Sequence, residues 1–305
     1  MRLATTTADF DGFLTTYQEK VDCVCDAGFR YIDLSMYSIE PDDALLVRDD
    51  WRAYAVQLLE HTKKRGARFV QAHAPGGNPL SKDRAEVEEL VRATVRSIEV
   101  CGVLGIPNIV VHAGMQAGLG KEESFAENKK FFSRLFSAME QNGVNVLCEN
   151  STRRNMGDLY FTNSGADMKE FVQYVGHPRL HACWDTGHAN CEGAQYAEIT
   201  AIGSDLYGVH INDNRGMQDE HILPYLGTVN LDEIMHALID VKYQGYFTFE
   251  AGSTLRPPNY WLGDRAPFAA DTRLARPPLF MQQRLEALLY EMGEYILKAY
   301  GCFEE

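Results

Sequence analysis

The sequence contains no long apolar run and no recognisable leader segment. No apolar stretch in the 305 residues approaches the roughly 18 to 20 that a membrane-spanning helix needs, so we expect no membrane partner. The first ten residues, MRLATTTADF, lack the basic region and apolar stretch of a secretory signal. Both absences favour a cytoplasmic protein.

Positive charge is also scarce relative to the acidic content. The chain carries 29 Lys and Arg against 43 Asp and Glu, a formal net charge of −14. Proteins that bind nucleic acids neutralise phosphates with Lys and Arg, so this balance argues against a nucleic-acid partner.

Cysteine is odd in number, which excludes a complete set of internal disulfides. Of the 7 Cys, Cys23 and Cys25 are separated by one residue, a spacing typical neither of zinc ligands nor of a redox pair. Free thiols agree with a cytoplasmic location.

What the chain does have is an alternation of short β-rich segments with segments of helical period. The expected strands cover residues 2–6, 31–36, 68–73, 108–112, 145–149, 180–185, 206–210 and 246–250. They are apolar almost throughout, as parallel strands covered on both faces are. Between them, segments such as 86–104 place Val91, Val95 and Ile98 on one helical face. Eight such units predict an α/β fold, a single (β/α)8 TIM barrel.

A doubly wound open sheet is the alternative architecture. No G-x-G-x-x-G follows the first strand and no second domain is evident, so we favour the barrel. We expect one domain over residues 1–305, with a long Pro-rich loop at 253–278 and a C-terminal helix at 279–300. The loop carries Trp and Tyr, so we expect it to pack over a pocket or into a subunit contact of a homo-oligomer.

Six of the eight expected strands end in a residue type that binds metals. In a parallel barrel these ends meet at one rim, where active sites are built. The six residues are His73, His112, Glu149, Asp185, His210 and Glu250. A single His at a strand end is more often a hydrogen-bonded structural residue. Several buried carboxylates brought together, however, would repel one another without a cation between them.

We therefore predict a divalent-metal site at this rim. The expected ligands are Glu149, Asp185, His210 and Glu250. Three carboxylates with one imidazole suit Mn²⁺, and Zn²⁺ is compatible, with Co²⁺ or Mg²⁺ as alternatives.

Five segments around these residues carry a family resemblance. LCENS, CWDTGHAN, VHINDN, DEHILPYLGTVN and FTFEAG, in register over residues 68–252, resemble the xylose isomerase-like TIM barrels. That superfamily includes sugar isomerases, ketose 3-epimerases and apurinic endonucleases of the endonuclease IV type. The resemblance to the epimerases implies that the four expected ligands hold one metal. It also implies that His188 helps to hold the substrate and that Arg215 binds a substrate oxygen.

The endonuclease IV branch uses further ligands to hold three zinc ions. Counterparts of all of them are present, namely His73, His112, His188, Asp219 and His221. A trinuclear centre and a phosphodiesterase activity therefore stay open, although the acidic balance weighs against DNA.

Two further side chains are candidates for substrate binding. Trp184, beside a strand end, could stack on a sugar ring, and packing at the rim is an equally good explanation. Arg153, in the loop after Glu149, could bind a phosphate or carboxylate, and a solvated surface arginine is as good an explanation.

We expect a metal-dependent isomerase or epimerase of a sugar, sugar phosphate or sugar acid, with a small-molecule carbohydrate as its partner. Glu149 and Glu250 would remove and return a proton on either side of an enediolate. The alternatives are an endonuclease IV-like phosphodiesterase and a non-catalytic metal- and sugar-binding barrel.

Overall fold

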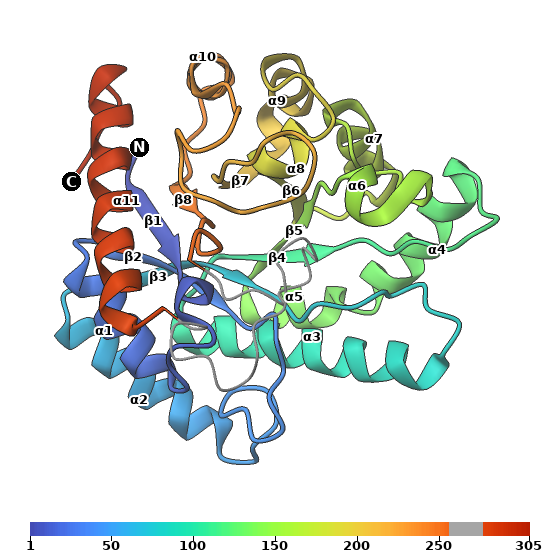
Figure 1. Ribbon diagram of the computed structural model, residues 1–305. Coiled ribbons are helices and arrows are strands. Elements are labelled where there is room, and N and C mark those ends of the chain that lie inside the picture. The colour runs from blue at the N-terminus through green and yellow to red at the C-terminus, as the bar shows by residue number, and fades with distance from the viewer. Residues whose placement is uncertain (256–276) are drawn as a thin grey trace, which may run out of the picture.

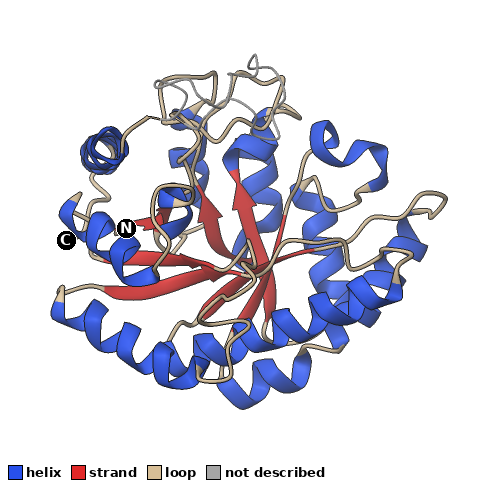
Figure 2. Ribbon diagram, turned by 60° about the horizontal axis from the view of Figure 1, so that its bottom comes forward, coloured by secondary structure: helices blue, strands red, loops and turns tan. Residues whose placement is uncertain are grey.

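Eight parallel strands lie side by side in the order β7-β6-β5-β4-β3-β2-β1-β8. The computed structural model describes residues 1–255 and 277–305. The strands are β1 (Leu3–Thr6), β2 (Tyr31–Ser35), β3 (Arg68–His73), β4 (Asn108–His112), β5 (Asn145–Glu149), β6 (Leu180–Asp185), β7 (Leu206–His210) and β8 (Phe247–Phe249). Figure 2 shows them converging inside a ring of helices.

The sheet closes on itself through Ile211, just after β7. The Ile211 N–H donates to the Thr248 carbonyl at 2.8 Å, and its carbonyl accepts from the Glu250 N–H at 3.1 Å. Ile211 also pairs in parallel with Phe249. These contacts join β7 to β8, so the predicted TIM barrel is confirmed and the open doubly wound sheet is excluded.

Helices connect successive strands and cover the outside of the barrel (Figure 1). They are α1 (Tyr17–Asp26), α2 (Trp51–Lys64), α3 (Arg84–Leu104), α4 (Lys121–Ser133), α5 (Phe136–Asn142), α6 (Arg153–Met156), α7 (Gly165–Val175), α8 (Thr186–Asn190), α9 (Tyr196–Ile202), α10 (Leu231–Asp240) and α11 (Leu279–Ala299). Three short 3₁₀ helices accompany them, η1 (Thr7–Phe10), η2 (Gly157–Leu159) and η3 (Gly203–Asp205).

Local sequence sets the ends of several helices. The Thr16 hydroxyl accepts from the Glu19 N–H at the start of α1, and the Glu19 carboxylate accepts from the Thr16 N–H, which is a capping box. At the start of α3 the Asp83 side chain accepts from the Ala85 and Glu86 N–H groups, and Gly105 ends that helix with a φ of 72° that favours glycine. These signals explain why the helical period of the sequence begins and ends where it does.

The main apolar core lies between the strands and the surrounding helices. Val111 of β4 and Ile98 of α3 are among its buried members. Each such side chain contributes about 1.5–3 kcal/mol when it leaves water. A second, small cluster of Val110, Leu147 and Cys183 fills the inside of the barrel.

The strand period decides which residues point into the barrel. Successive residues face opposite sides, so the residue two positions before each rim residue also points inward. These inner positions are Gln71, Val110, Leu147, Cys183, Gly208 and Thr248, all buried. A layer of mixed apolar and polar residues therefore lies directly beneath the rim.

The predicted loop at 253–278 falls almost wholly on residues 256–276, which lie outside the described residues. The expectation that it covers the pocket or a subunit contact concerns those residues. Among the helices that the structure describes, none combines the length and the apolar character that crossing a bilayer requires.

Candidate metal centre

Four side chains from four neighbouring strand ends come together at the C-terminal rim. Glu149, Asp185 and His210 end β5, β6 and β7, and Glu250 follows β8. Each offers a ligand atom, and these atoms lie within 4.8 Å of one another. His210 Nδ1 is 2.6 Å from Glu149 Oε1 and 3.3 Å from Glu250 Oε2. The fold thus brings together the four residues expected as ligands, and we call them the first group.

Glu149 belongs to a second group as well. The Nε2 atoms of His73 and His112 lie 3.4 Å and 3.2 Å from Glu149 Oε2. Ligand atoms of these three residues also lie within 4.8 Å of one another. One carboxylate oxygen therefore faces His210 and the other faces the two histidines, which is the arrangement of a bridging ligand.

A third group is made by His188, Asp219 and His221. His188 Nε2 lies 3.0 Å from Asp219 Oδ2, and His221 Nε2 lies 3.0 Å from Asp219 Oδ1. His188 also connects this group to the first, since its Nδ1 is 3.6 Å from Asp185 Oδ1. The additional residues named from the sequence as possible ligands thus lie in two groups beside the first.

Main-chain carbonyls orient three of the histidines. Nδ1 of His73 lies 2.8 Å from the Ala74 carbonyl, Nδ1 of His188 lies 2.9 Å from that of Asn150, and Nδ1 of His221 lies 3.0 Å from that of Glu250. A ring that donates its Nδ1–H to a carbonyl presents Nε2 as the ligand atom. In each of the three, Nε2 faces a carboxylate of the groups.

Asp185 is held by a set of neutral donors. Asn212 Nδ2 donates to its Oδ2 at 2.6 Å, and the His188 N–H donates to its Oδ1 at 2.6 Å. The turn between these residues requires glycine, because a Cβ on Gly187 would lie 1.8 Å from Asn212 Oδ1. The turn in CWDTGHAN, which depends on Gly187, therefore holds the Asp185 carboxylate in place.

The site is buried, and its charges shift the pKa values of its members. Burial alone would raise the pKa of Glu149, but the adjacent His210 and His112 bring it well below its usual range. Burial lowers the pKa of His112 to about 4 despite Glu149. Burial also opposes charge on His221, but Asp219 outweighs it and raises the pKa of that imidazole to about 10.

The donor chemistry of the groups fits divalent cations. Glu149, Asp185, Asp219 and Glu250 place four carboxylates at one rim, and among the described residues only histidines form ion pairs with them. Buried carboxylates without Lys or Arg partners are costly unless a cation joins them. Carboxylate and imidazole ligands suit Mn²⁺ and Zn²⁺.

The three other candidate substrate residues lie elsewhere. Trp184 is fully buried and donates from its indole nitrogen to Gln195 Oε1 at 3.2 Å, so its ring packs in the core and the expected stacking on a sugar does not fit. Its neighbour Asp185 faces the barrel, and the strand period turns Trp184 to the opposite face. Arg215 pairs with Glu220, and Arg153 pairs with Glu192 at 3.4 Å. Both arginines are therefore engaged by carboxylates that lie outside the three groups.

Several residues that support the site were not identified from the sequence. Asn150 and Asn212 position Asp185, and the Tyr160 hydroxyl donates to the Glu149 carbonyl at 3.1 Å. Asp33 and Gln71 approach His210 from inside the barrel. For Asp33 a signal existed, because an acidic residue inside the apolar strand YIDLS is unusual.

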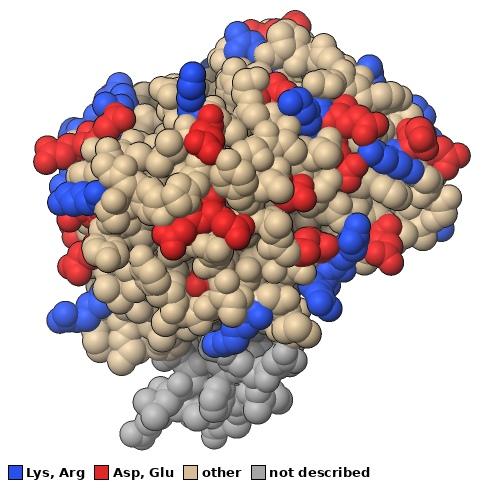
Figure 3. Space-filling view, turned by 90° about the horizontal axis from the view of Figure 1, so that it is seen from above, with Lys and Arg blue, Asp and Glu red and all other residues tan. Residues whose placement is uncertain are grey.

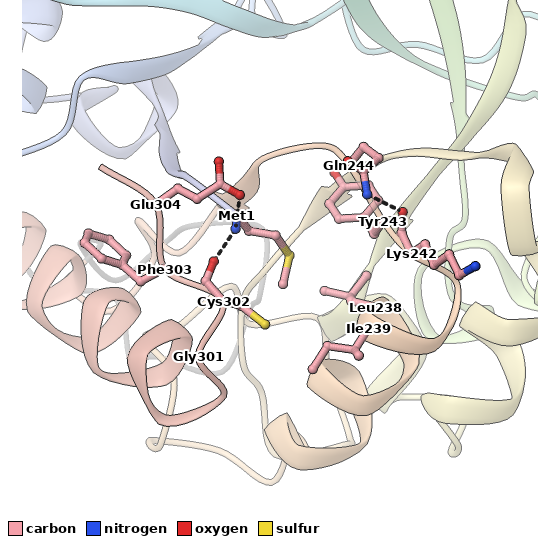
Figure 4. Close-up of a pocket in the computed structure, with 10 residues that line it drawn as sticks. All are labelled: Met1, Leu238, Ile239, Lys242, Tyr243, Gln244, Gly301, Cys302, Phe303 and Glu304. Atoms are coloured by element: carbon pink, nitrogen blue, oxygen red, sulfur yellow. Dashed lines mark hydrogen bonds and ion pairs between the residues drawn. The ribbon is translucent and has the colours of Figure 1, made fainter.

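A cavity of about 330 Å³ lies at the opposite end of the barrel (Figure 4). Its lining includes Met1, which precedes β1, and Lys242 and Tyr243, which precede β8. The Met1 amino group bonds to the Cys302 carbonyl there and tethers the two chain ends to each other. Residues at this end of a TIM barrel serve stability, so this cavity is not the functional site.

The one face of the surface seen in Figure 3 carries charges of both signs. On the face drawn in Figure 3, acidic and basic side chains are interspersed without a continuous band of Lys and Arg. Nucleic-acid-binding faces carry such bands.

Comparison with known sequences gives one family. A profile of xylose isomerase-like TIM barrels matches residues 21–270. An uncharacterized protein of Methanocaldococcus jannaschii is 28% identical over 203 residues, 64% of this chain and 68% of the relative. A probable endonuclease 4 of Methanoculleus marisnigri is 30% identical over 185 residues, 53% of this chain and 62% of that relative. The chain thus matches less than two thirds of the latter protein's length.

Solved structures share the fold over nearly the whole chain. A D-psicose 3-epimerase from Clostridium cellulolyticum, solved with D-tagatose, has a TM-score of 0.74 at 18% identity. The match covers 97% of this chain and 99% of the epimerase. At this level of identity the likeness concerns the fold.

Proposed function

This chain belongs to the family of xylose isomerase-like TIM barrels, and on that premise we propose that it is a divalent-metal enzyme that isomerises or epimerises a small carbohydrate. The observation that carries the proposal is the pair of carboxylates beside His210, with Glu149 and Glu250 at 2.6 Å and 3.3 Å from its Nδ1. Two carboxylates that converge on one point can bind a cation and exchange protons with a substrate. The fold likeness to a ketose 3-epimerase supports the same chemistry.

Glu250 is the better placed of the two to take a proton from the substrate. Its side chain is 20% exposed, whereas that of Glu149 is 1% exposed. Glu149 is also engaged on both oxygens, by His210 on one and by His73 and His112 on the other. We therefore assign to Glu250 the removal of the proton next to a substrate carbonyl, which leaves an enediolate.

Glu149 would take up a proton from water and return it to the enediolate on the side facing the barrel interior, while Glu250 would release its proton to solvent. Removal from one face and return on the other inverts the carbon, which is epimerisation; return to the neighbouring carbon is isomerisation. A divalent ion held by Glu149, Asp185, His210 and Glu250, Mn²⁺ or Zn²⁺ by donor type, would polarise the carbonyl and stabilise the developing negative charge. His188, next to Asp185, would bind a substrate hydroxyl.

Isotope exchange tests this proposal. The metal-loaded protein is incubated in D₂O with a panel of pentoses, hexoses, their phosphates and sugar acids. We expect one of them to gain deuterium at the carbon next to the carbonyl as its epimer or isomer forms. Turnover without deuterium uptake would exclude proton transfer through an enediolate.

A metal-dependent phosphodiesterase is the second candidate, and a specific observation favours it. The second and third groups supply ligands for cations beyond the first, and sites with several metals are typical of phosphate-ester hydrolysis. The identity to a probable endonuclease 4 points the same way, whereas the net charge of −14 weighs against DNA.

Hydrolysis assays separate the two candidates. The same preparation is assayed with bis(p-nitrophenyl) phosphate and with a duplex that contains an abasic site. Cleavage of the duplex would replace the isomerase proposal. Binding of a metal and of a sugar without any turnover would instead favour a non-catalytic barrel.

A further inference from the structure

His210 is oriented in the opposite way to three other histidines of the site. His73, His188 and His221 bond through Nδ1 to main-chain carbonyls and present Nε2. His210 instead presents Nδ1 to Glu149 and Glu250, and its Nε2 points away from them into the barrel. No main-chain carbonyl among the described residues bonds to that nitrogen. Any hydrogen-bond partner of His210 Nε2 there is therefore a side chain.

Two side chains reach His210 Nε2. The amide nitrogen of Gln71 lies 2.9 Å away and Asp33 Oδ2 lies 3.4 Å away. Gln71 comes from β3, in the layer beneath the rim, and Asp33 comes from β2. β7 leaves room for the Gln71 amide because it has glycine there: a Cβ on Gly208 would lie 2.7 Å from Gln71 Oε1.

The chemistry of the ring decides what is needed at Nε2. A neutral imidazole that binds a cation through Nδ1 carries its proton on Nε2. That N–H needs an acceptor, and the Gln71 amide nitrogen is a donor. The acceptors within reach are the Asp33 carboxylate and, after the amide turns over, the Gln71 carbonyl oxygen. The carboxylate is the stronger of the two because it is charged.

Asp33 has the burial and the free oxygens expected of an acceptor for the His210 Nε2–H. It is fully buried, and neither of its oxygens has a hydrogen bond. Among the described residues its one ion-pair contact is His210 Nε2. A buried carboxylate without hydrogen bonds lowers stability, so packing does not explain its presence.

We propose that Asp33 is a positioning residue of the metal centre. When a cation is bound through Nδ1, the Asp33 carboxylate, 3.4 Å from Nε2, would accept the Nε2–H of His210, direct Nδ1 toward Glu149 and Glu250, and strengthen cation binding by the first group. A carboxylate behind a ligand histidine is a general device for this purpose. The inference rests on the metal requirement of the proposed function and is independent of the reaction.

Metal affinity tests the proposal without any substrate. The dissociation constant for Zn²⁺ or Mn²⁺ is measured by competition with a chromophoric chelator for the wild type, Asp33→Asn and Asp33→Leu. We expect a loss of roughly 10- to 100-fold for Asp33→Leu, and a smaller loss for Asp33→Asn, which retains a neutral acceptor. Glu286→Gln is the matched control, because Glu286 is equally buried and also has an oxygen without a hydrogen bond. Its affinity should equal that of the wild type.

Two further measurements separate positioning from a structural role. In ¹⁵N-histidine NMR spectra of the zinc-loaded protein, His210 should be protonated on Nε2, and Asp33→Leu should weaken that signature. The metal-free Asp33 variants should unfold at the wild-type temperature or above it, because they lose a buried charge without hydrogen bonds.

Several results would overturn the proposal. One is a wild-type metal affinity in Asp33→Leu. If Gln71→Leu loses affinity in the same experiment, Gln71 and not Asp33 is the acceptor. A wild type that binds no divalent cation would remove the metal centre and this role together. A 10-fold or larger loss in Asp33→Leu with no turnover on any carbohydrate would leave the role of Asp33 standing and reject only the isomerase function.

Discussion

Asn150 holds the main chain of Asp185 with two hydrogen bonds. Its Oδ1 accepts from the Asp185 N–H at 2.6 Å, and its Nδ2 donates to the Asp185 carbonyl at 3.0 Å. The Asn150 carbonyl also accepts from His188 Nδ1 at 2.9 Å. Because Asn150 directly follows Glu149, one residue connects the end of β5 to Asp185 at the end of β6 and to His188 in α8.

Loss of this side chain should destabilise the fold as well as the site. In Asn150→Leu the N–H and carbonyl of Asp185 lose their buried partners, so we expect the free energy of unfolding to fall by about 1–3 kcal/mol for each group left without a partner. Urea denaturation of the metal-free protein measures this. Asn108→Leu is the control, because that side chain bonds at 3.0 Å to the partly buried Asn145 side chain and should cost less. Equal stability of Asn150→Leu and wild type would contradict the role of Asn150.

The second prediction concerns metal content. We expect the purified protein to carry at least one divalent ion per chain and Asp185→Ala to lose the ion of the first group. His221→Ala removes a member of the third group and touches the first group only through the contact of Nδ1 with Glu250, 3.5 Å from its Oε2, so it should retain that ion. Elemental analysis of the three proteins provides the counts. Full metal content in Asp185→Ala would place the ion elsewhere.

Glu250→Gln tests the proposed proton transfer. An amide cannot take up the proton, so deuterium exchange and turnover should fall roughly 10²- to 10⁴-fold, with the metal content measured in parallel. Glu122→Gln is the control, because Glu122 lies at an exposed position of α4 and is not part of the three groups. Unchanged exchange in Glu250→Gln with the metal in place would assign the base to another residue.

Nucleic acid should not bind. At a net charge of −14, we expect no measurable binding of duplex DNA, intact or abasic, in a gel-shift assay at physiological salt. A basic endonuclease of known activity serves as the positive control. Micromolar affinity for the abasic duplex would favour the phosphodiesterase.

Glu286 should make stability depend on pH away from the metal centre. Burial raises the pKa of its carboxyl from 4.5 to about 7, against hydrogen bonds with Thr5 and Asp9. Below pH 4.5 the carboxyl is protonated in both the folded and the unfolded state. Above that pH the unfolded state loses its proton first, so this group's contribution to stability is lost as pH rises toward 7.

Replacement of Glu286 should remove that dependence. Glu286→Gln stays neutral, so its stability relative to the wild type should increase by about 3 kcal/mol across this range. Urea denaturation at several pH values gives the difference, and Glu122→Gln, at an exposed position of α4, is the control. A pH-independent difference would show that the pKa of Glu286 is the same in the folded and unfolded states.

The sequence by itself determined the strands and the candidate ligands at their ends. Buried parallel strands are apolar throughout, so Glu149, Asp185 and Glu250 are recognisable as polar ends of apolar segments. The rule that parallel strand ends share one rim then brings these residues together. The same period of two also turns Trp184 away from the face of Asp185, so its placement in the core was within reach of the sequence.

Only the tertiary structure decided which atoms meet. The strand period tells which face a side chain occupies, but distances across a barrel depend on how the ring closes and how each strand is shifted against its neighbour. The pairing of β2 with β3 shifts between Ile32 and Asp33, a change that no local pattern predicts. Whether His210 offers Nδ1 or Nε2, and whether Asp33 can reach the other nitrogen, depends on residues from β2, β3, β5 and β7. These strands are far apart in the chain, and the closed barrel sets their side chains against one another.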